Sequence, residues 1–309
     1  MYNGVINVYK EPGFTSFDVV AKLRGILKQK KIGHTGTLDP DAEGVLVVCL
    51  GKATKLCELL TNKDKSYVAT LRLGQTSDTE DASGTILTQK EVTATNEEVL
   101  HAIMSFVGSY EQIPPMYSAI KINGKKLYEL ARMGTVVERT PRKVTIHSIE
   151  VIKMELPYVT FRVSCGKGTY IRSLCRDIGE KLGCGGLMEH LVRDCVISEE
   201  TGKSFDRKDA FSLAQIEQMV RTGEFESHIL GIDELFPTLH KLYVTPEGDK
   251  KLQNGNFLLW EDFKTIKEEQ IKTDFGDGMK FLIYTTENTF RAIYRYDEKK
   301  HRLKVDKMF

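Results

Sequence analysis

Apolar and polar residues alternate in several stretches of the chain, which is typical of strands with one buried face. The alternation predicts strands at residues 4–9, 66–73, 144–151 and 158–165, and the last two are expected to be antiparallel neighbours. A continuous apolar run, Gly44–Leu50, predicts a fully buried strand.

Helical spacing of apolar residues and helix-capping residues predict the other elements. Thr15 or Ser16 caps a helix that runs to about Lys28. The same reasoning predicts further helices at these positions: 54–60, 96–106, 125–133 and 168–182. The run Gly183-Cys184-Gly185-Gly186 ends the last of them as a helix C-cap does. The acidic stretch at residues 75–84 is predicted to be a loop.

The order of these elements favours an α+β fold. Strands and helices do not alternate regularly, so we expect a mixed, largely antiparallel central sheet flanked by helices. Pro237 interrupts the pattern, and after a short helix from Pro246 the alternation resumes at residues 280–284, 289–294 and 301–305. We therefore predict two units, residues 1–235 and a small β-rich unit of residues 236–309.

Composition narrows the class of protein. With 309 residues, 41% hydrophobic and 28% charged, the chain is an ordinary globular protein, and its net charge of +1 gives no global signal for nucleic acid. No apolar stretch approaches the roughly 20 residues that span a bilayer. The N-terminus lacks the features of a signal peptide, and the six cysteines lack metal-type spacing. We expect a cytoplasmic, monomeric protein that does not bind membranes.

The octapeptide Gly33-His34-Thr35-Gly36-Thr37-Leu38-Asp39-Pro40 is the first candidate for chemistry. Its glycines permit positive φ, and Pro40 pushes Asp39 towards an extended conformation. A carboxylate fixed in such a loop, near a histidine and two hydroxyls, suits a nucleophile or a general base. The alternative is an Asp39 that caps the next turn beside an ordinary loop histidine.

The segment Ser164–Leu174 is a second candidate. A strand ends there in a Gly-x-Gly turn before a helix, so free N–H groups, with Lys167 and Arg172, could receive an anion. The alternative is a plain strand-to-helix connection with solvated basic residues. If Arg172 reaches Asp39, the pair would hold that carboxylate ionised and oriented.

Two tyrosines and one acidic cluster are open to two interpretations. Tyr67 and Tyr170 could line a site and stack on a base, or they could pack against neighbouring side chains. The acidic residues lack calcium-loop spacing, so a solvated loop is favoured over a cation site for Asp78, Glu80 and Asp81.

Short basic clusters flank these candidate segments and suit a surface that follows RNA phosphates. They are Lys28, Lys30 and Lys31; Lys121, Lys125 and Lys126; and Arg139, Arg142 and Lys143. No phosphate-binding glycine loop, zinc motif or nucleophile elbow occurs, so the motifs support neither a metal nor a nucleotide cofactor.

Five segments occur in an order that resembles the bacterial tRNA pseudouridine-55 synthases: Lys10–Ser16, Gly33–Pro40, Tyr67–Gly74, Ser164–Leu174 and Leu182–Gly185. The resemblance covers roughly residues 4–197 and is most specific at the octapeptide. It implies a pseudouridine synthase fold in residues 1–235 and a PUA-like RNA-binding module in residues 236–309. It also implies isomerisation of the T-loop uridine of tRNA, at position 55, without a cofactor. The T-arm would bind the larger unit, and the acceptor stem would contact the module.

The resemblance assigns roles to individual residues. Asp39 would start glycosidic cleavage, and Arg172 would pair with it. His34 would fill the space left by the extruded nucleotide, and Tyr67 would stack on the target base. Two further residues would line the pocket: Tyr170 and Leu191.

The chain departs from the family pattern at one place. The family's Lys-Pro-x-Gly is replaced by Lys10-Glu11-Pro12-Gly13, a segment that we expect to support the site from beneath.

The physical chemistry of the implied reaction fits these residues. Flipping a base out of a folded RNA loop loses a few kcal/mol of stacking, which aromatic contacts offset. An ordinary aspartate, with a pKa of about 3.9, is ionised at neutral pH.

The sequence leaves two questions open. Asp39 could attack the sugar, attack the base or abstract a sugar proton. A tRNA-binding folding chaperone whose catalysis is secondary is the alternative function, whereas the basic clusters disfavour a small-molecule isomerase.

Overall fold

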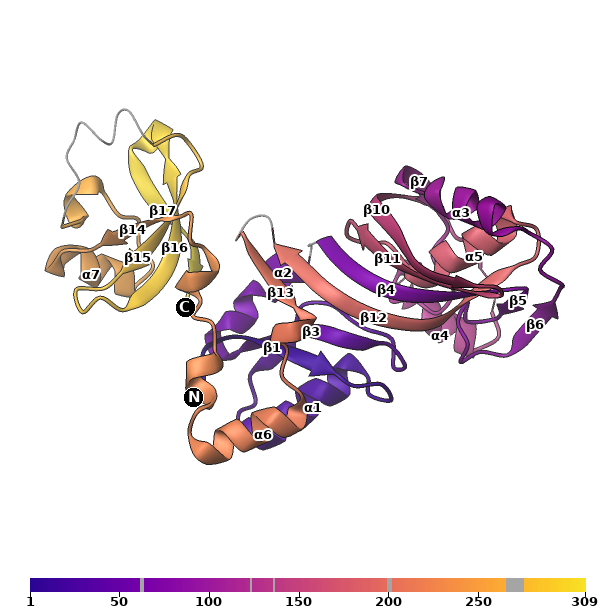
Figure 1. The fold of residues 1–309 in the computed structure, drawn as a ribbon. Helices are drawn as coiled ribbons and strands as arrows, with labels where there is room; N and C mark the ends of the chain where they lie inside the picture. Colours follow the sequence, from indigo (N-terminus) through magenta and orange to yellow (C-terminus); the bar gives the residue numbers. More distant parts are fainter. Residues whose placement is uncertain (62–63, 123, 136, 199–201, 265–274) are drawn as a thin grey trace.

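The structure, a computed structural model, describes residues 1–61, 64–122, 124–135, 137–198, 202–264 and 275–309. A nine-stranded sheet dominates the described chain, and a four-stranded sheet lies near its C-terminus (Figure 1). The main path of the large sheet runs through β1 (Gly4–Lys10), β3 (Glu43–Leu50), β12 (Gly186–Ser198), β4 (Asp64–Leu73), β11 (Tyr158–Cys165), β10 (Arg142–Glu155) and β7 (Gly108–Gln112). Two short strands join its edges: β2 (Ile32–His34) pairs with β3, and β13 (Lys203–Asp206) pairs with β12.

The strand pairing confirms the predicted α+β class with a mixed, largely antiparallel sheet. Among the described strands of this sheet, only β12 and β3 pair in parallel, where Val192 faces Glu43 and Arg193 faces Gly44. β12 also pairs antiparallel with β4 along most of its length, so it joins the two halves of the sheet (Figure 1).

Strand β3 is apolar from Val45 to Leu50 because both of its faces are buried there. Val45, Val47 and Cys49 pack into one core, and Leu46, Val48 and Leu50 pack into another. The second core is closed by α1 (Ser16–Leu27) and α6 (Leu213–Thr222). Burying one such side chain contributes about 1.5–3 kcal/mol, so this strand is a rigid base for the loop that precedes it.

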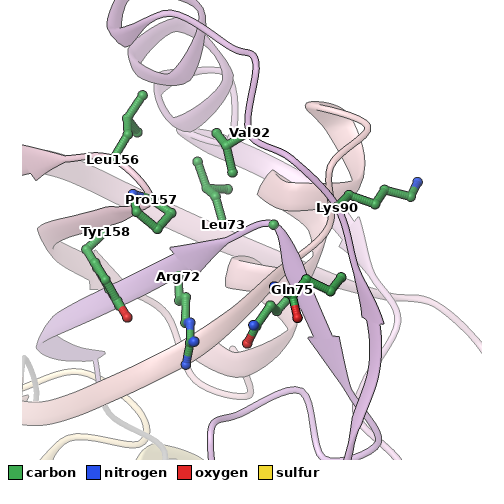
Figure 2. A pocket seen from close by; sticks show the side chains of 10 residues that line it. Arg72, Leu73, Gln75, Lys90, Val92, Leu156, Pro157 and Tyr158 are labelled. Carbon is green, nitrogen blue, oxygen red and sulfur yellow. The ribbon is translucent and has the colours of Figure 1, made fainter.

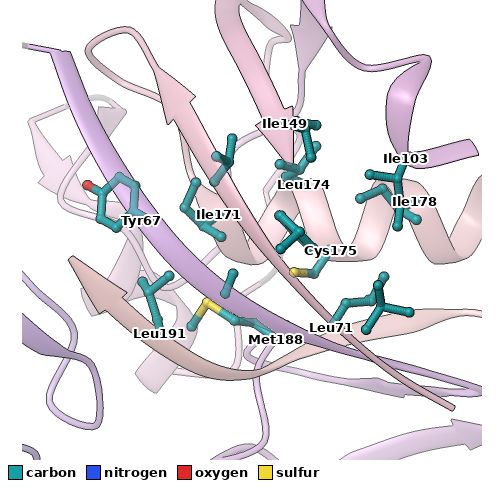
Figure 3. Packing of buried hydrophobic residues seen from close by; sticks show 14 of the residues in the cluster. Tyr67, Leu71, Ile103, Ile149, Ile171, Leu174, Cys175, Ile178, Met188 and Leu191 are labelled. Carbon is teal, nitrogen blue, oxygen red and sulfur yellow. The ribbon is translucent and has the colours of Figure 1, made fainter. Parts of the chain in front are cut away.

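The other half of the sheet packs against α5 (Ile171–Lys181) and α3 (Asn96–Met104). Ile171, Leu174 and Ile178 of α5 enter its core (Figure 3). Tyr67 and Leu191 belong to the same cluster and lie together on β4 and β12 (Figure 3).

Several predicted elements differ in detail from those observed. The helix predicted at residues 54–60 is a 3₁₀ turn, Gly51–Leu56, followed by α2 (Cys57–Thr61). α5 begins at Ile171 because Gly168 has a φ of 83°, which an α-helix does not accept. The predicted loop at 75–84 begins with a strand, β5 (Gln75–Ser77), which pairs with β6 (Ile86–Gln89). The helix predicted at 125–133 is shorter, α4 (Leu127–Arg132), and follows the small hairpin of β8 (Lys121–Ile122) and β9 (Lys125–Lys126).

The C-terminal residues form the predicted β-rich unit. Its sheet consists of β14 (His240–Tyr243), β15 (Lys280–Tyr284), β16 (Phe290–Asp297) and β17 (Arg302–Met308), with α7 (Pro246–Gln253) beside it. Ile293 and Phe309 share a buried cluster with Val47 and Leu56, so this unit packs directly on the large sheet. None of the helices in the described ranges is long and apolar enough to cross a membrane.

We predict opposite effects from two Gly-to-Ala substitutions. Gly44 has a φ of 105°, and a Cβ there would lie 2.2 Å from the Arg193 carbonyl oxygen, so Gly44→Ala should destabilise the fold by about 2 kcal/mol or more. Gly25 lies exposed in α1 with open space around it, so Gly25→Ala should stabilise by up to about 1 kcal/mol. Thermal unfolding of both variants checks the pair, and a wild-type melting temperature for Gly44→Ala would contradict the account.

Candidate active site

The octapeptide connects β2 to β3, and buried side chains hold it in place. The Leu38 N–H donates to the Ser16 hydroxyl at 2.9 Å, and Ser16 is fully buried at the start of α1. Neither Gly33 nor Gly36 adopts the positive φ that a glycine permits. Gly33 belongs to the extended strand β2 instead, where a Cβ would lie 3.0 Å from the Cys57 sulfur.

Lys10 supports the loop from beneath, as predicted. Its Nζ is buried and donates to the carbonyl oxygens of Pro40 at 2.8 Å and Ala42 at 2.5 Å. Burial lowers the pKa of Lys10 to about 8, although the nearby carboxylates of Asp41 and Asp39 oppose the shift. The shifted proline of this segment does not prevent the contact, since the lysine itself reaches the loop.

Arg172 reaches Asp39, as the sequence allowed. Its Nε lies 3.0 Å from Asp39 Oδ2, and its Nη2 donates to Oδ1 at 3.1 Å, so the pair is bidentate. The guanidinium is buried and also donates to the carbonyl oxygens of Thr79 at 3.0 Å and Tyr117 at 2.9 Å. Asp39 is thereby fixed in orientation, while its side chain keeps 36% of its surface exposed.

The electrostatics of Asp39 differ from the expectation of an ordinary aspartate. Burial raises the pKa of Asp39 above its usual value of 3.8, and the Asp81 carboxylate raises it further. Arg172 and Lys10 oppose this rise because a nearby cation favours the ionised carboxylate. The arginine therefore offsets part of the desolvation that the loop imposes.

The acidic segment is only partly solvated: Asp78 is exposed, but Glu80 and Asp81 are not, which corrects our prediction for these two residues. Glu80 is only 9% exposed, accepts a hydrogen bond from the Ser173 hydroxyl at 2.6 Å and pairs with Arg176. Asp81 Oδ2 lies 3.8 Å from the Nε of Arg172. These partners lie on α5, about 90 residues away in sequence, so local spacing could not show them.

Tyr67 and Leu191 belong to one buried apolar cluster with Leu38 of the octapeptide. Tyr67 is 8% exposed, and burial raises the pKa of its phenol to about 12, so the ring stays neutral at ordinary pH. In Figure 3 its hydroxyl points away from α5 and the rest of the cluster.

Tyr170 directly precedes α5. Its backbone N–H donates to the Gln112 side chain at 2.9 Å, and burial raises the pKa of its phenol. Neither alternative holds in full, because Gln112 already binds the Tyr170 N–H, and Arg172 is buried against Asp39 instead of being solvated.

His34 stands at the end of β2, half-buried. Its Nδ1 accepts from the Gly36 N–H at 3.4 Å, and burial together with Arg193 lowers the pKa of the imidazole, so the ring is neutral at neutral pH. His34 borders a pocket of about 480 Å³ whose lining includes Phe17, Arg24, Lys30 and Lys31.

A second pocket lies elsewhere on the molecule and contains none of the predicted site residues. It measures about 390 Å³ and is lined by Arg72, Lys90, Pro157 and Tyr158 among others (Figure 2). It opens at the β5 end of β4, whereas Tyr67 lies near the opposite end of that strand.

The predicted basic clusters are largely at the surface. Lys28, Lys30, Lys31, Lys121, Lys125, Arg142 and Lys143 are exposed. Arg139 is an exception, because it donates to the Pro114 carbonyl oxygen at 3.0 Å and lies 3.7 Å from Glu80.

Sequence reasoning missed Arg193, which is 1% exposed and donates to the carbonyl oxygen of Gly36 at 3.1 Å. The available signal was a lone arginine directly after the apolar pair Leu191-Val192. In the part of the chain that the structure describes, no three His, Cys, Asp or Glu side chains gather as metal ligands would, and the six cysteines are free.

Solved structures identify the class to which this fold belongs. The structure titled "Crystal Structure of a Cbf5-Nop10-Gar1 Complex" matches with a TM-score of 0.67 and 26% identity, over 99% of this chain and 84% of that chain. One titled "Structure of H/ACA RNP bound to a substrate RNA containing 2'-deoxyuridine" matches with a TM-score of 0.66 and 25% identity, over the same shares of the two chains. The fold is that of the pseudouridine synthases.

Sequence comparison identifies the family within that class. Residues 24–171 match "TruB family pseudouridylate synthase (N terminal domain)". The chain is 54% identical to tRNA pseudouridine synthase B of Lachnoclostridium phytofermentans, over 99% of both proteins. It is 44% identical to the enzyme of the same name from Clostridium kluyveri, over 91% of this chain and 94% of that protein. The chain belongs to the TruB family of pseudouridine synthases.

We predict that Asp39 titrates above 3.8 and Asp18 below it. Burial raises the pKa of Asp39, whereas hydrogen bonds from Thr15 lower the pKa of the exposed Asp18. As the pH falls, Asp39 should therefore become protonated first. Carboxyl ¹³C NMR of labelled aspartates measures both, and Arg172→Lys should move the Asp39 midpoint further up because the bidentate contact is lost. An Asp39 midpoint at or below that of Asp18 would contradict this electrostatic account.

Proposed function

We propose that the protein isomerises the T-loop uridine of tRNA, at position 55, to pseudouridine. The observation that carries the proposal is the bidentate Asp39–Arg172 pair on a loop fixed by buried side chains. The printed names of the relatives, tRNA pseudouridine synthase B, support tRNA as the substrate. The protein would act as a cytoplasmic monomer.

The proposed reaction needs no co-substrate. The N1–C1′ bond of the nucleotide breaks and a C5–C1′ bond forms, while C5 loses a proton and N1 gains one. Asp39 would start the cleavage in its ionised form. Arg172 would keep the carboxylate oriented, and its charge favours the ionised form against the desolvation of the site.

The remaining site residues would hold an extruded nucleotide. Leaving the stack loses a few kcal/mol, which contacts with the flipped base offset. Tyr67 would stack on the base, with Leu191 and Tyr170 lining the same pocket. His34 would enter the gap left in the RNA, and a neutral imidazole suits stacking because it carries no charge that needs hydration.

The RNA would extend over both units. The exposed lysines Lys30 and Lys31 beside His34 suit contacts with phosphates of the T-arm. Residues 1–235 would form the catalytic domain, and residues 236–309 would be a PUA-like module that contacts the acceptor stem.

The catalytic assignment predicts different outcomes for two neighbouring carboxylates. Asp39→Asn should bind a T-arm stem-loop and form no pseudouridine, whereas Asp41→Asn, an exposed residue two positions away, should modify it at the wild-type rate. Pseudouridine mapping of the transcript, without any added cofactor, checks both variants. Substantial turnover by Asp39→Asn would refute the role of Asp39. The same variant tests the alternative that the protein is a tRNA folding chaperone. An RNA chaperone needs no carboxylate at this position, so Asp39→Asn should keep its full cellular function if that alternative is correct.

The proposed role of the C-terminal module predicts a dependence on RNA length. An RNA that carries both the T-arm and the acceptor stem should bind more tightly than the T-arm stem-loop alone, because only the longer RNA reaches the module. Binding isotherms at one fixed salt concentration make the comparison, since phosphate contacts depend strongly on salt. Equal affinities for the two RNAs would exclude acceptor-stem contact.

A further inference from the structure

Arg193 is a buried cation that forms no ion pair with a carboxylate of the described residues. It lies on β12, is 1% exposed and is among the largest fully buried side chains of the protein. Desolvation lowers the pKa of its guanidinium. Burying an unpaired charge is unfavourable by several kcal/mol unless its N–H donors find acceptors. The acceptors of the Arg193 guanidinium therefore indicate why it is buried.

The Arg193 guanidinium donates to backbone carbonyl oxygens of two segments, the octapeptide that carries Asp39 and the strand β3 that follows it. Its Nε donates to Val45, on β3, at 2.6 Å. Its Nη2 and Nη1 donate to Gly36 at 3.1 Å and Thr37 at 3.4 Å, which lie three and two positions before Asp39. One planar group therefore fixes the loop that carries Asp39 relative to the buried strand that follows it.

Arg193 also lies beside the base-stacking candidate, Tyr67. Tyr67 and Arg193 are register partners on the antiparallel strands β4 and β12, so their side chains lie side by side on one face of the sheet. The positive charge of Arg193 opposes the rise that burial causes in the pKa of the Tyr67 phenol. An arginine only donates, so the Tyr67 phenol oxygen, and not the phenol proton, is the group that can face the guanidinium.

The backbone of Arg193 is fixed as firmly as its side chain. It pairs with Gly44 on β3, and the close approach of its carbonyl oxygen leaves no room for a Cβ at Gly44. The pairing of β12 with β4 shifts register directly after Arg193, between it and Cys195. The guanidinium is thus held between β3, β4 and the octapeptide, with little freedom to rotate.

We propose that Arg193 is a positioning residue that fixes the Tyr67 ring and the Asp39 loop relative to each other. The inference rests on the proposed function, because it assumes that Asp39 and Tyr67 act on one nucleotide. It adds a residue that touches neither the base nor the sugar. A lysine cannot replace it, since a single ammonium lacks the planar fork that serves three carbonyl oxygens at once.

The first test separates chemistry from RNA binding. Arg193→Lys should lower the single-turnover rate of pseudouridine formation by about 100-fold, the effect of misplacing reacting groups by roughly 1 Å, with the dissociation constant of a T-arm stem-loop unchanged. Arg162→Lys on neighbouring β11, where the side chain is 45% exposed, is the matched control and should keep the wild-type rate. A wild-type rate for Arg193→Lys would overturn the proposal.

The second test reads the Tyr67 contact without RNA or turnover. In protein labelled with ¹³Cζ-tyrosine, the Tyr67 resonance should move in Arg193→Lys and stay in place in Arg162→Lys, because only the first changes the guanidinium beside the Tyr67 ring. An unmoved resonance would overturn the proposal. Arg193→Met should move it too, and the lysine variant carries the test if the methionine variant does not fold. Absence of pseudouridine with wild-type protein would instead refute the proposed function, while the NMR result would still report on positioning.

Discussion

The bidentate contact between Arg172 and Asp39 is the interaction on which the geometry of the site depends. Its guanidinium also binds the carbonyl oxygens of Thr79 and Tyr117, so one side chain on α5 joins three segments that have no regular structure of their own at these points. α5 is in turn fixed by its apolar residues in the core of the large sheet. The packing of α5 on the sheet thereby fixes the orientation of the Asp39 carboxylate.

Buried cations hold this loop from several sides. Lys10 and Arg193 bind its carbonyl oxygens from β1 and β12, and Arg172 binds its carboxylate from α5. Each of these cations is desolvated, which lowers the pKa of Lys10 and of Arg193. The desolvation reduces the stability of the fold, but the loop is held in a fixed geometry. Such preorganisation suits an enzyme, because groups that are already oriented need not reorganise when charge develops during the reaction.

The sequence predicted what depends on local pattern. Alternation located β1, β4 and β11, the apolar run located β3, and the Thr15 cap located the start of α1. The octapeptide and its expected partner Arg172 were identified because their segments are distinctive and the contact needs only one carboxylate and one guanidinium.

The sequence could not predict what depends on distant contacts. β12 escaped notice because Glu189, His190 and Asp194 interrupt its apolar residues, and two register shifts against β4 break the period of two. The pairing of Glu80 could not be read from its own segment, since its partners Ser173 and Arg176 come from α5. The contacts of Arg193 were unpredictable for the same reason, because its acceptors on the octapeptide lie more than 150 positions away.

The central claim is that this site rearranges a uridine without any added reagent. Release of tritium from a T-arm RNA labelled at C5 of uridine, with enzyme in excess, tests it most directly, because C5 must lose its hydrogen when the new bond forms. The account predicts release of the label from the single T-loop uridine by the wild-type protein in buffer alone. RNA that binds fully and retains all of its tritium would contradict it.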